Sequence, residues 1–164
     1  MKMLALLSLI FLTACGFHPV YGVNKYTPVG AEAKFTQIAI TNIPNREGQF
    51  LRNRLIDTLH RNAPNEPKRY TLNINPIEER LRELDITIDS DTTRAQLTLT
   101  TTMKLTDKTT NKTLINRTLT SVASFNVLGS EFANRISEQS TRENVLDDLA
   151  RQIEHQIALY FKRT

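Results

Sequence analysis

The chain has 164 residues, of which 40% are hydrophobic and 23% are charged, and its formal net charge is +4. This length suits one domain with a substantial core, and the weak positive charge does not identify a partner by itself. The only cysteine is Cys15, so an internal disulfide is excluded.

Residues 1–14 have the pattern of a secretory signal peptide. Lys2 supplies a positive charge, an uncharged apolar run extends from Met3 to Leu12, and small residues follow. That run is about half of the ~20 residues that a membrane-spanning helix needs. Leu12-Thr13-Ala14-Cys15 then matches a lipobox, in which small residues fit a peptidase groove and the thiol accepts a lipid.

This motif predicts cleavage before Cys15, which becomes an N-palmitoyl, S-diacylglycerol cysteine. The alternative is an ordinary signal peptide with a chance cysteine near its end. Several acyl chains anchor a protein stably, so we expect a lipoprotein held on the periplasmic side of a membrane, where nucleic acid is excluded as a partner. Residues 15–34, rich in glycine and proline, are predicted to be a tether, and residues 35–164 a single domain.

The first elements of this domain are a strand and a helix. Phe35 to Thr41 is predicted to be a strand, because the spacing of Ile38 and Ile40 would place both side chains on one face of it. Asn45 is a candidate helix N-cap. From Glu47 to Arg61, leucines recur every four residues and predict an amphipathic helix.

Three β segments follow. Residues 69–89 are predicted to be one long irregular strand or two short ones, and Pro76 favours an edge or a bulge. The clearest strand buries one face, made of Leu97, Leu99, Thr101, Met103 and Leu105. A polar hairpin loop, Asp107 to Lys112, leads to a returning strand. There Arg117 and Ser121 interrupt the apolar face, which predicts a bulge or incomplete burial.

A long amphipathic helix is predicted within Ser130 to Tyr160. Its apolar stripe contains Phe132, Ile136, Val145, Leu149, Ile153, Ile157 and Tyr160. The polar stretch from Gln139 to Asn144 predicts a weak point or a kink. Together the elements predict an α+β fold in which two helices pack on one face of a mixed, roughly four-stranded sheet.

No catalytic, metal-binding or cofactor-binding motif was found in the sequence. His18, His60 and His155 lie in the tether and on the two helices, where surface histidines are the simplest interpretation. The charged run from Glu78 to Glu83 suits a solvated loop or edge better than a pair of catalytic carboxylates. We therefore expect neither an enzyme nor a bound cofactor or metal.

Two polar features indicate binding surfaces. Residues 92–102 are rich in threonine, and Arg94 is their only charged residue. This composition predicts either a sheet face that packs against a polar surface of another protein, or an ordinary solvent-exposed face in which threonine is favoured by its β propensity. The strand pair and its hairpin also carry five basic residues: Arg94, Lys104, Lys108, Lys112 and Arg117. They are candidates for binding the phosphates of an acidic glycolipid, or they are a solvated hairpin end.

The residues from Cys15 to Gly22, Cys-Gly-Phe-His-Pro-Val-Tyr-Gly, resemble the opening of alphaproteobacterial lipopolysaccharide-assembly lipoproteins, the LptE family. Three further stretches agree with the family in order. They are Leu51 to Leu55, Thr93-Arg94-Ala95, and the closing helix from Phe132-Ala133 through Leu149 to Ile153 and Tyr160-Phe161. The resemblance covers essentially the whole mature chain.

The resemblance implies two helices on a four-stranded sheet and a non-catalytic role. It implies that the protein plugs the lumen of the LptD β-barrel, helps that barrel to assemble, and assists lipopolysaccharide transport to the cell surface. Gly16 after the lipidated cysteine favours the outer membrane. Family members have been proposed to bind lipopolysaccharide through basic residues on the strands or loops. Here the candidates are Arg94, from its position at a strand entry, followed by Lys108 and Lys112 at the hairpin, and they are chosen because basic residues gather there.

Two other functions stay open. A periplasmic lipid carrier or ABC-transporter-auxiliary lipoprotein should have a sizeable apolar groove between helices and sheet, whereas a plug should have a filled core. A periplasmic hydrolase would need a pocket with convergent polar groups.

Overall fold

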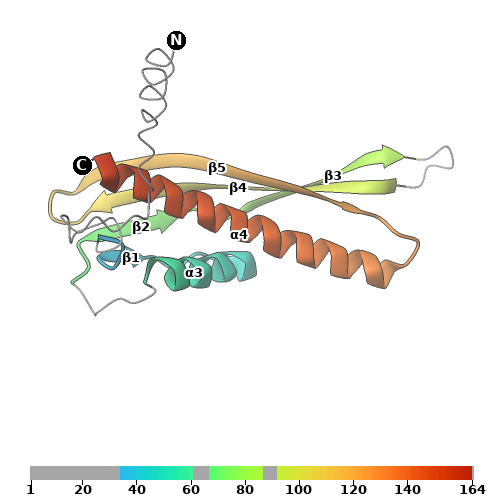
Figure 1. The fold of residues 1–164 in the computed structure, drawn as a ribbon, viewed down its shortest axis with the longest axis horizontal. Helices are drawn as coiled ribbons and strands as arrows, with labels where there is room; N and C mark the ends of the chain where they lie inside the picture. The colour runs from blue at the N-terminus through green and yellow to red at the C-terminus, as the bar shows by residue number, and fades with distance from the viewer. Residues whose placement is uncertain (1–33, 61–66, 87–91, 164) are drawn as a thin grey trace, which may run out of the picture.

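The computed structural model describes residues 34–60, 67–86 and 92–163 (Figure 1). Within those ranges, no helix combines the length and the apolar character needed to cross a bilayer. The elements are β1 (Ile38–Ile40), α3 (Asn45–Leu59), β2 (Tyr70–Ile74), β3 (Glu78–Ile86), β4 (Thr92–Asp107), β5 (Lys112–Asn126) and α4 (Glu131–Arg163).

The strands form one five-stranded sheet built around β4, whereas the sequence predicted about four strands. One edge of β4 pairs antiparallel with β5 over nearly its whole length, from Arg94 to Asp107. The other edge pairs with β3 and then with β2, so these two strands lie one after the other along β4. Pro76 lies in the break between them, because proline has no N–H for a sheet hydrogen bond.

Both helices lie on one face of the sheet, as predicted (Figure 1). The alternation predicted for β4 is confirmed, since Leu97, Leu99, Met103 and Leu105 have 0% exposure and pack with leucines and isoleucines of α3 and α4. Thr101 shares this inner face, and its hydroxyl donates to the carbonyl oxygen of Asn75 at 2.8 Å. Burial of these side chains is the main stabilising contribution to the fold.

Three boundaries differ from those predicted. β1 covers only Ile38–Ile40, because the chain at Phe35 is helical and its ring packs 6.5 Å from that of Phe161. Pro44 is the N-cap of α3 and makes no side-chain cap hydrogen bond, so Asn45 is not the cap. Asn45 instead has φ 69°, a left-handed conformation that asparagine adopts more readily than most residues.

Helix α4 is continuous over 33 residues and has no break at Gln139 to Asn144. Its apolar stripe is buried from Val145 to Phe161, but the predicted burial of Phe132 and Ile136 is wrong, since they are 76% and 57% exposed. The reason is length: α3 has only 15 residues and lies under one half of the molecule (Figure 1).

Candidate partner and glycolipid surfaces

The sheet face opposite the helices, here called the outer face, is not covered by any described element (Figure 1). Along β4 and β5 it is mostly neutral and polar. Thr100 and Thr102 lie opposite Thr120 and Thr118, and the paired hydroxyls are 3.1 and 3.0 Å apart. Such cross-strand pairs stabilise the sheet and leave a flat hydroxyl-lined surface.

The five basic residues of the strand pair do not form one cluster, which corrects that part of the prediction. Lys108 and Lys112 lie together at the β4–β5 turn, while Arg94 lies opposite Asn126 at the other end of the hairpin. Lys108 follows Arg94 by 14 residues, so at ~3.3 Å per residue the two lie about 45 Å apart along the strand. Arg117 is on the inner side, opposite Met103, and is exposed.

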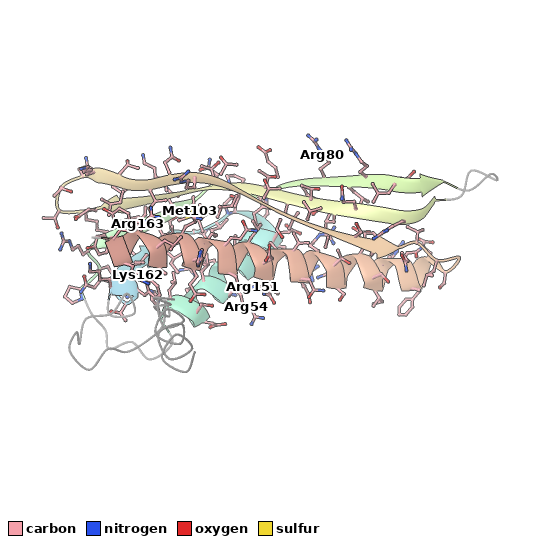
Figure 2. All side chains as sticks on the ribbon, turned by 45° about the horizontal axis from the view of Figure 1, so that its top comes forward. Arg54, Arg80, Met103, Arg151, Lys162 and Arg163 are labelled. Atoms are coloured by element: carbon pink, nitrogen blue, oxygen red, sulfur yellow. The ribbon has the colours of Figure 1, made fainter. Side chains whose placement is uncertain are left out.

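Two arginines that the sequence interpretation overlooked lie near Arg94. Arg80 and Arg82 of β3 pair with Thr98 and Gln96, so their side chains are on the outer face (Figure 2 labels Arg80). Arg82 and Arg94 are diagonal neighbours, a relation that places side chains roughly 7–8 Å apart. All three are exposed, and none forms a salt bridge with another described residue. In the sequence, the alternation of Arg80, Leu81 and Arg82 could have indicated a strand with both arginines on one face.

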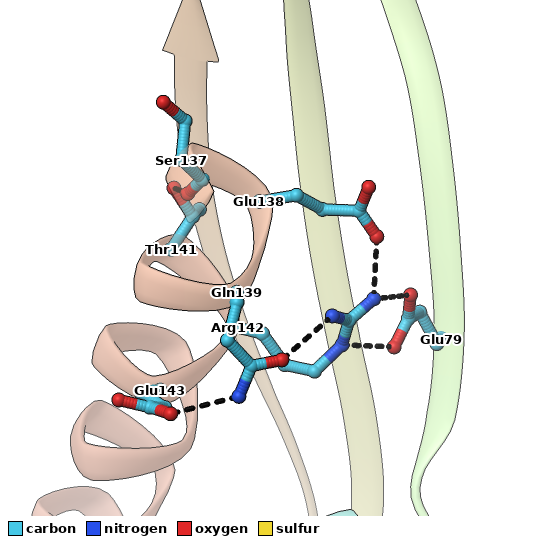
Figure 3. A network of polar contacts seen from close by, with 7 residues as sticks. All are labelled: Glu79, Ser137, Glu138, Gln139, Thr141, Arg142 and Glu143. Carbon is cyan, nitrogen blue, oxygen red and sulfur yellow. Dashed lines mark hydrogen bonds and ion pairs between the residues drawn. The ribbon is translucent and has the colours of Figure 1, made fainter. Parts of the chain in front are cut away.

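A polar network joins α4 to the edge strand β3 where α3 does not reach (Figure 3). The Arg142 guanidinium donates from Nη2 and Nε to the two carboxylate oxygens of Glu79, at 2.7 and 3.0 Å. Nη2 also donates to Glu138 at 2.7 Å, and Gln139 joins Arg142 to Glu143. The hydrogen bond to Glu79 is the main reason that the pKa of Arg142 is raised. These contacts also explain why the polar stretch of α4 remains helical.

Replacing Arg142 by methionine should lower the free energy of unfolding by about 1–2 kcal/mol, since the side chain is only 17% exposed and its loss leaves Glu79 unpaired. Amide exchange in β3 should also become faster. Urea denaturation measures the free energy of unfolding, and hydrogen exchange measures the opening of β3. Arg135→Met is the matched control, because the Arg135–Glu131 pair is 77% and 79% exposed and should contribute under about 0.5 kcal/mol. Equal effects of the two substitutions would contradict this role.

Ser121 is a polar residue on the inner face of β5, and it is accommodated there by a hydrogen bond to α4. Ser121 is buried, and its hydroxyl donates to Asp148 Oδ2 at 2.8 Å. Gln152 donates to the same oxygen at 2.8 Å and to the carbonyl oxygen of Thr120 at 3.2 Å. The hydrogen bond from Ser121, followed by that from Gln152, lowers the pKa of the Asp148 carboxyl. The predicted interruption of the apolar face is thus a helix–strand contact.

This lowered pKa predicts how stability depends on pH. A carboxyl whose pKa falls on folding stabilises the folded chain above its unfolded pKa of about 3.9, and that contribution is lost as the pH falls through the folded value. The hydrogen bond from Arg54 lowers the pKa of Asp147 in the same direction. The urea midpoint should therefore be flat from about pH 7 to 5 and fall below about pH 4. Asp148→Asn should flatten that fall, and an unchanged wild-type midpoint at pH 3 would contradict the assignment.

Cys15 and the predicted signal peptide lie outside the described residues. His60, predicted to be a surface residue, follows α3 and is partly buried, with Nε2 2.9 Å from the carbonyl oxygen of Ile38. His155 is exposed on α4. The described site therefore has two parts on the outer face, namely the hydroxyl-lined surface along β4 and β5 and the three-arginine cluster of Arg80, Arg82 and Arg94.

The described chain is a two-layer α+β domain with a buried apolar core and an uncovered polar sheet face. The chain matches the LptE family of lipopolysaccharide-assembly proteins over residues 35–160 and belongs to that family. The family assignment predicted from the sequence is thus confirmed, and the role of the chain is in lipopolysaccharide assembly. A search of curated proteins gave no match.

Solved structures of bacterial lipoproteins have a similar fold. A lipoprotein of Caulobacter crescentus is 19% identical with a TM-score of 0.62, over 82% of this chain and 96% of that chain. A minor lipoprotein of Acinetobacter baumannii is 26% identical with a TM-score of 0.59, over 76% and 92%. Rare lipoprotein B of Shewanella oneidensis is 11% identical with a TM-score of 0.59, over 77% and 95%.

Proposed function

We propose that this chain is an outer-membrane lipoprotein, anchored through lipid on Cys15 at the periplasmic side, that plugs and helps to assemble an LptD-type β-barrel. The observation that carries the proposal is the uncovered outer face along β4 and β5. A free sheet face exposed only to water usually carries many charges, whereas along β4 and β5 this face carries mainly threonine, serine and asparagine, with Arg94 and Lys104 among them. A water-filled barrel has a polar interior, so a neutral hydroxyl surface suits contact with its wall.

The filled core argues against the alternative of a periplasmic lipid carrier or transporter-auxiliary lipoprotein. That function calls for an apolar space between the helices and the sheet. Here the layer contains fully buried side chains from both, including Leu99, Leu105, Leu149 and Ile153. Close packing of this kind leaves little room for an acyl chain.

The proposal is tested by purifying the tagged, lipidated protein from detergent-solubilised outer membranes and identifying the co-purifying proteins. We expect an LptD-type barrel in a 1:1 ratio that persists through high-salt washing. Recovery of the lipoprotein alone, or with inner-membrane transporter subunits, would overturn the plug function and favour the auxiliary-lipoprotein alternative.

We further propose that the three-arginine cluster binds lipopolysaccharide phosphates. Arg94 thus keeps the role suggested by its sequence position, with Arg80 and Arg82 as neighbours, while Lys108 and Lys112 would form a separate site at the hairpin turn. Guanidinium groups suit phosphate because they form charge-assisted, bidentate hydrogen bonds. None of the three forms a salt bridge with another described side chain, and the register places Asp85 opposite Arg94.

Reversing the three charges, with R80E, R82E and R94E together, should weaken lipopolysaccharide binding by about tenfold or more. The measurement is binding of labelled lipopolysaccharide to the purified protein at several salt concentrations. K108E with K112E is the matched variant at the other end of the hairpin and should have a smaller effect. If only the lysine variant loses binding, the site is at the hairpin turn; if neither does, both sets are withdrawn.

A further inference from the structure

The exposed apolar residues of α4 continue the side of the helix that faces α3. Ile136 precedes Asp147 by 11 residues, about three helical turns, so the two lie on nearly the same side. Asp147 accepts two hydrogen bonds from Arg54 of α3, at 2.7 and 2.8 Å. Because α3 is the shorter helix, Phe132 and Ile136 extend beyond it and are 76% and 57% exposed.

A third exposed apolar residue, Leu128, lies in the loop just before α4, and its backbone is held by a residue of that helix. Asn134 accepts a hydrogen bond from the N–H of Leu128 at 2.6 Å and donates one to its carbonyl oxygen at 2.8 Å. These bonds fix the backbone of Leu128, whose side chain is nevertheless 54% exposed. A surface that is already ordered loses less conformational entropy on binding. We call Leu128, Phe132 and Ile136 the amino-end patch.

The chemistry around the amino-end patch favours a protein over a bilayer. Helices that lie on membranes carry mainly Lys and Arg on their polar face. The corresponding part of α4 instead carries Glu131, Glu138 and Glu143, two of them paired with arginines. Three side chains also cover much less than the ~800 Å² per partner of a stable protein interface. The patch therefore suits an anchor within a larger interface rather than a dimer contact of its own.

The amino-end patch and the outer face lie at the same end of the molecule, the patch on its helix side and the outer face on its sheet side (Figure 1). Leu128 follows Asn126, the last residue of β5, and Val122 on the outer face of β5 is 50% exposed. At this end the sheet is backed by α4 without α3, so the molecule is thinner there (Figure 1). A partner that encloses this end contacts the outer face and the amino-end patch together.

We infer that the amino-end patch docks into an apolar recess on the inner wall of the barrel partner, with Phe132 as its central contact. This inference rests on the proposed plug function. The thin end of the molecule enters the barrel, the outer face contacts the polar wall, and the patch supplies the apolar anchor. Buried aromatic side chains surrounded by polar residues commonly dominate the affinity of such interfaces.

The test uses the full lipidated protein, purified from outer membranes with its barrel. The triple variant L128S/F132S/I136S should recover at least about tenfold less barrel per lipoprotein than the wild type. N53S/D57S is the control at the other end of the molecule, because Asn53 and Asp57 are exposed on α3 and lie outside the patch. It should recover barrel within about twofold of the wild type. Circular dichroism and urea unfolding establish that each variant is folded.

The possible outcomes separate the inference from the proposed function. Wild-type levels of barrel with the triple variant would overturn the inference while leaving the plug function intact. Loss of a homo-oligomer with unchanged barrel recovery would assign the patch to a second copy of the chain and would also overturn it. No barrel with the wild type would overturn both. F132L should retain the barrel, since it preserves an apolar side chain, and its loss of barrel would contradict a simple apolar anchor.

Discussion

Replacing Leu149 by alanine should lower the free energy of unfolding by about 2–5 kcal/mol. Leu149 has 0% exposure and lies in the core between α4 and the sheet. Truncation removes buried methyl and methylene groups and leaves a cavity that its neighbours fill only in part. A drop of this size is a large fraction of the stability of an ordinary domain. Urea denaturation of the purified protein measures it.

Phe132→Ala is the matched control on the same helix. Phe132 is the larger residue, but at 76% exposure it buries little surface, so its removal should change the free energy of unfolding by less than about 0.5 kcal/mol. The two substitutions therefore separate the covered part of α4 from the uncovered part. Equal destabilisation would mean that Phe132 is buried in the free protein and would also remove the basis for the amino-end patch.

Replacing Gly48 by alanine should lower the free energy of unfolding by about 1–3 kcal/mol. Helix propensity alone predicts the opposite sign, because alanine is favoured over glycine within a helix by about 1 kcal/mol. A Cβ atom at Gly48, however, would lie 2.7 Å from Ile43 Cγ2 and 2.9 Å from both the carbonyl carbon and the carbonyl oxygen of Ile43. Two of these atoms are backbone, and Ile43 has 0% exposure, so the loop before α3 would have to move.

Gly129→Ala is the natural control for this effect. A Cβ atom at Gly129 would have no neighbour within 4 Å, and its substitution should change the unfolding free energy by less than about 0.5 kcal/mol. Thermal and urea midpoints of the two variants provide the comparison. A Gly48→Ala protein as stable as the wild type would mean that α3 does not pack closely on the loop at Ile43.

Local periodicity was sufficient to predict most individual elements. The alternation of Leu97, Leu99, Met103 and Leu105 identified the buried face of β4, because successive side chains of a strand point to opposite faces. The leucines of α3 identified its buried side in the same way, with a period of about 3.6 residues. Two such helices need an apolar surface to cover, so the α+β class also followed from the sequence.

Local periodicity could not predict which distant segments of the chain pair with each other. The sequence left residues 69–89 as one strand or two, and only pairing with β4 defines β2 and β3 as two strands end to end. The same pairing placed Arg80 and Arg82 beside Arg94, and it separated Arg94 from Lys108 by the length of β4. Composition indicates which charges are present, but the register of a sheet determines which of them are neighbours.

By itself the sequence determined which side of each strand and helix is apolar, and its motifs led to the LptE family, because both depend on residues close together in the chain. Only the tertiary structure decided how much of each apolar side is covered. The stripe of α4 has apolar residues at both ends, from Phe132 to Ile136 and from Val145 to Phe161, yet burial requires a second element alongside, and α3 is too short to cover Phe132 and Ile136. An exposed patch of this kind is therefore a property of two elements whose lengths differ, and the pattern of either one alone does not contain it.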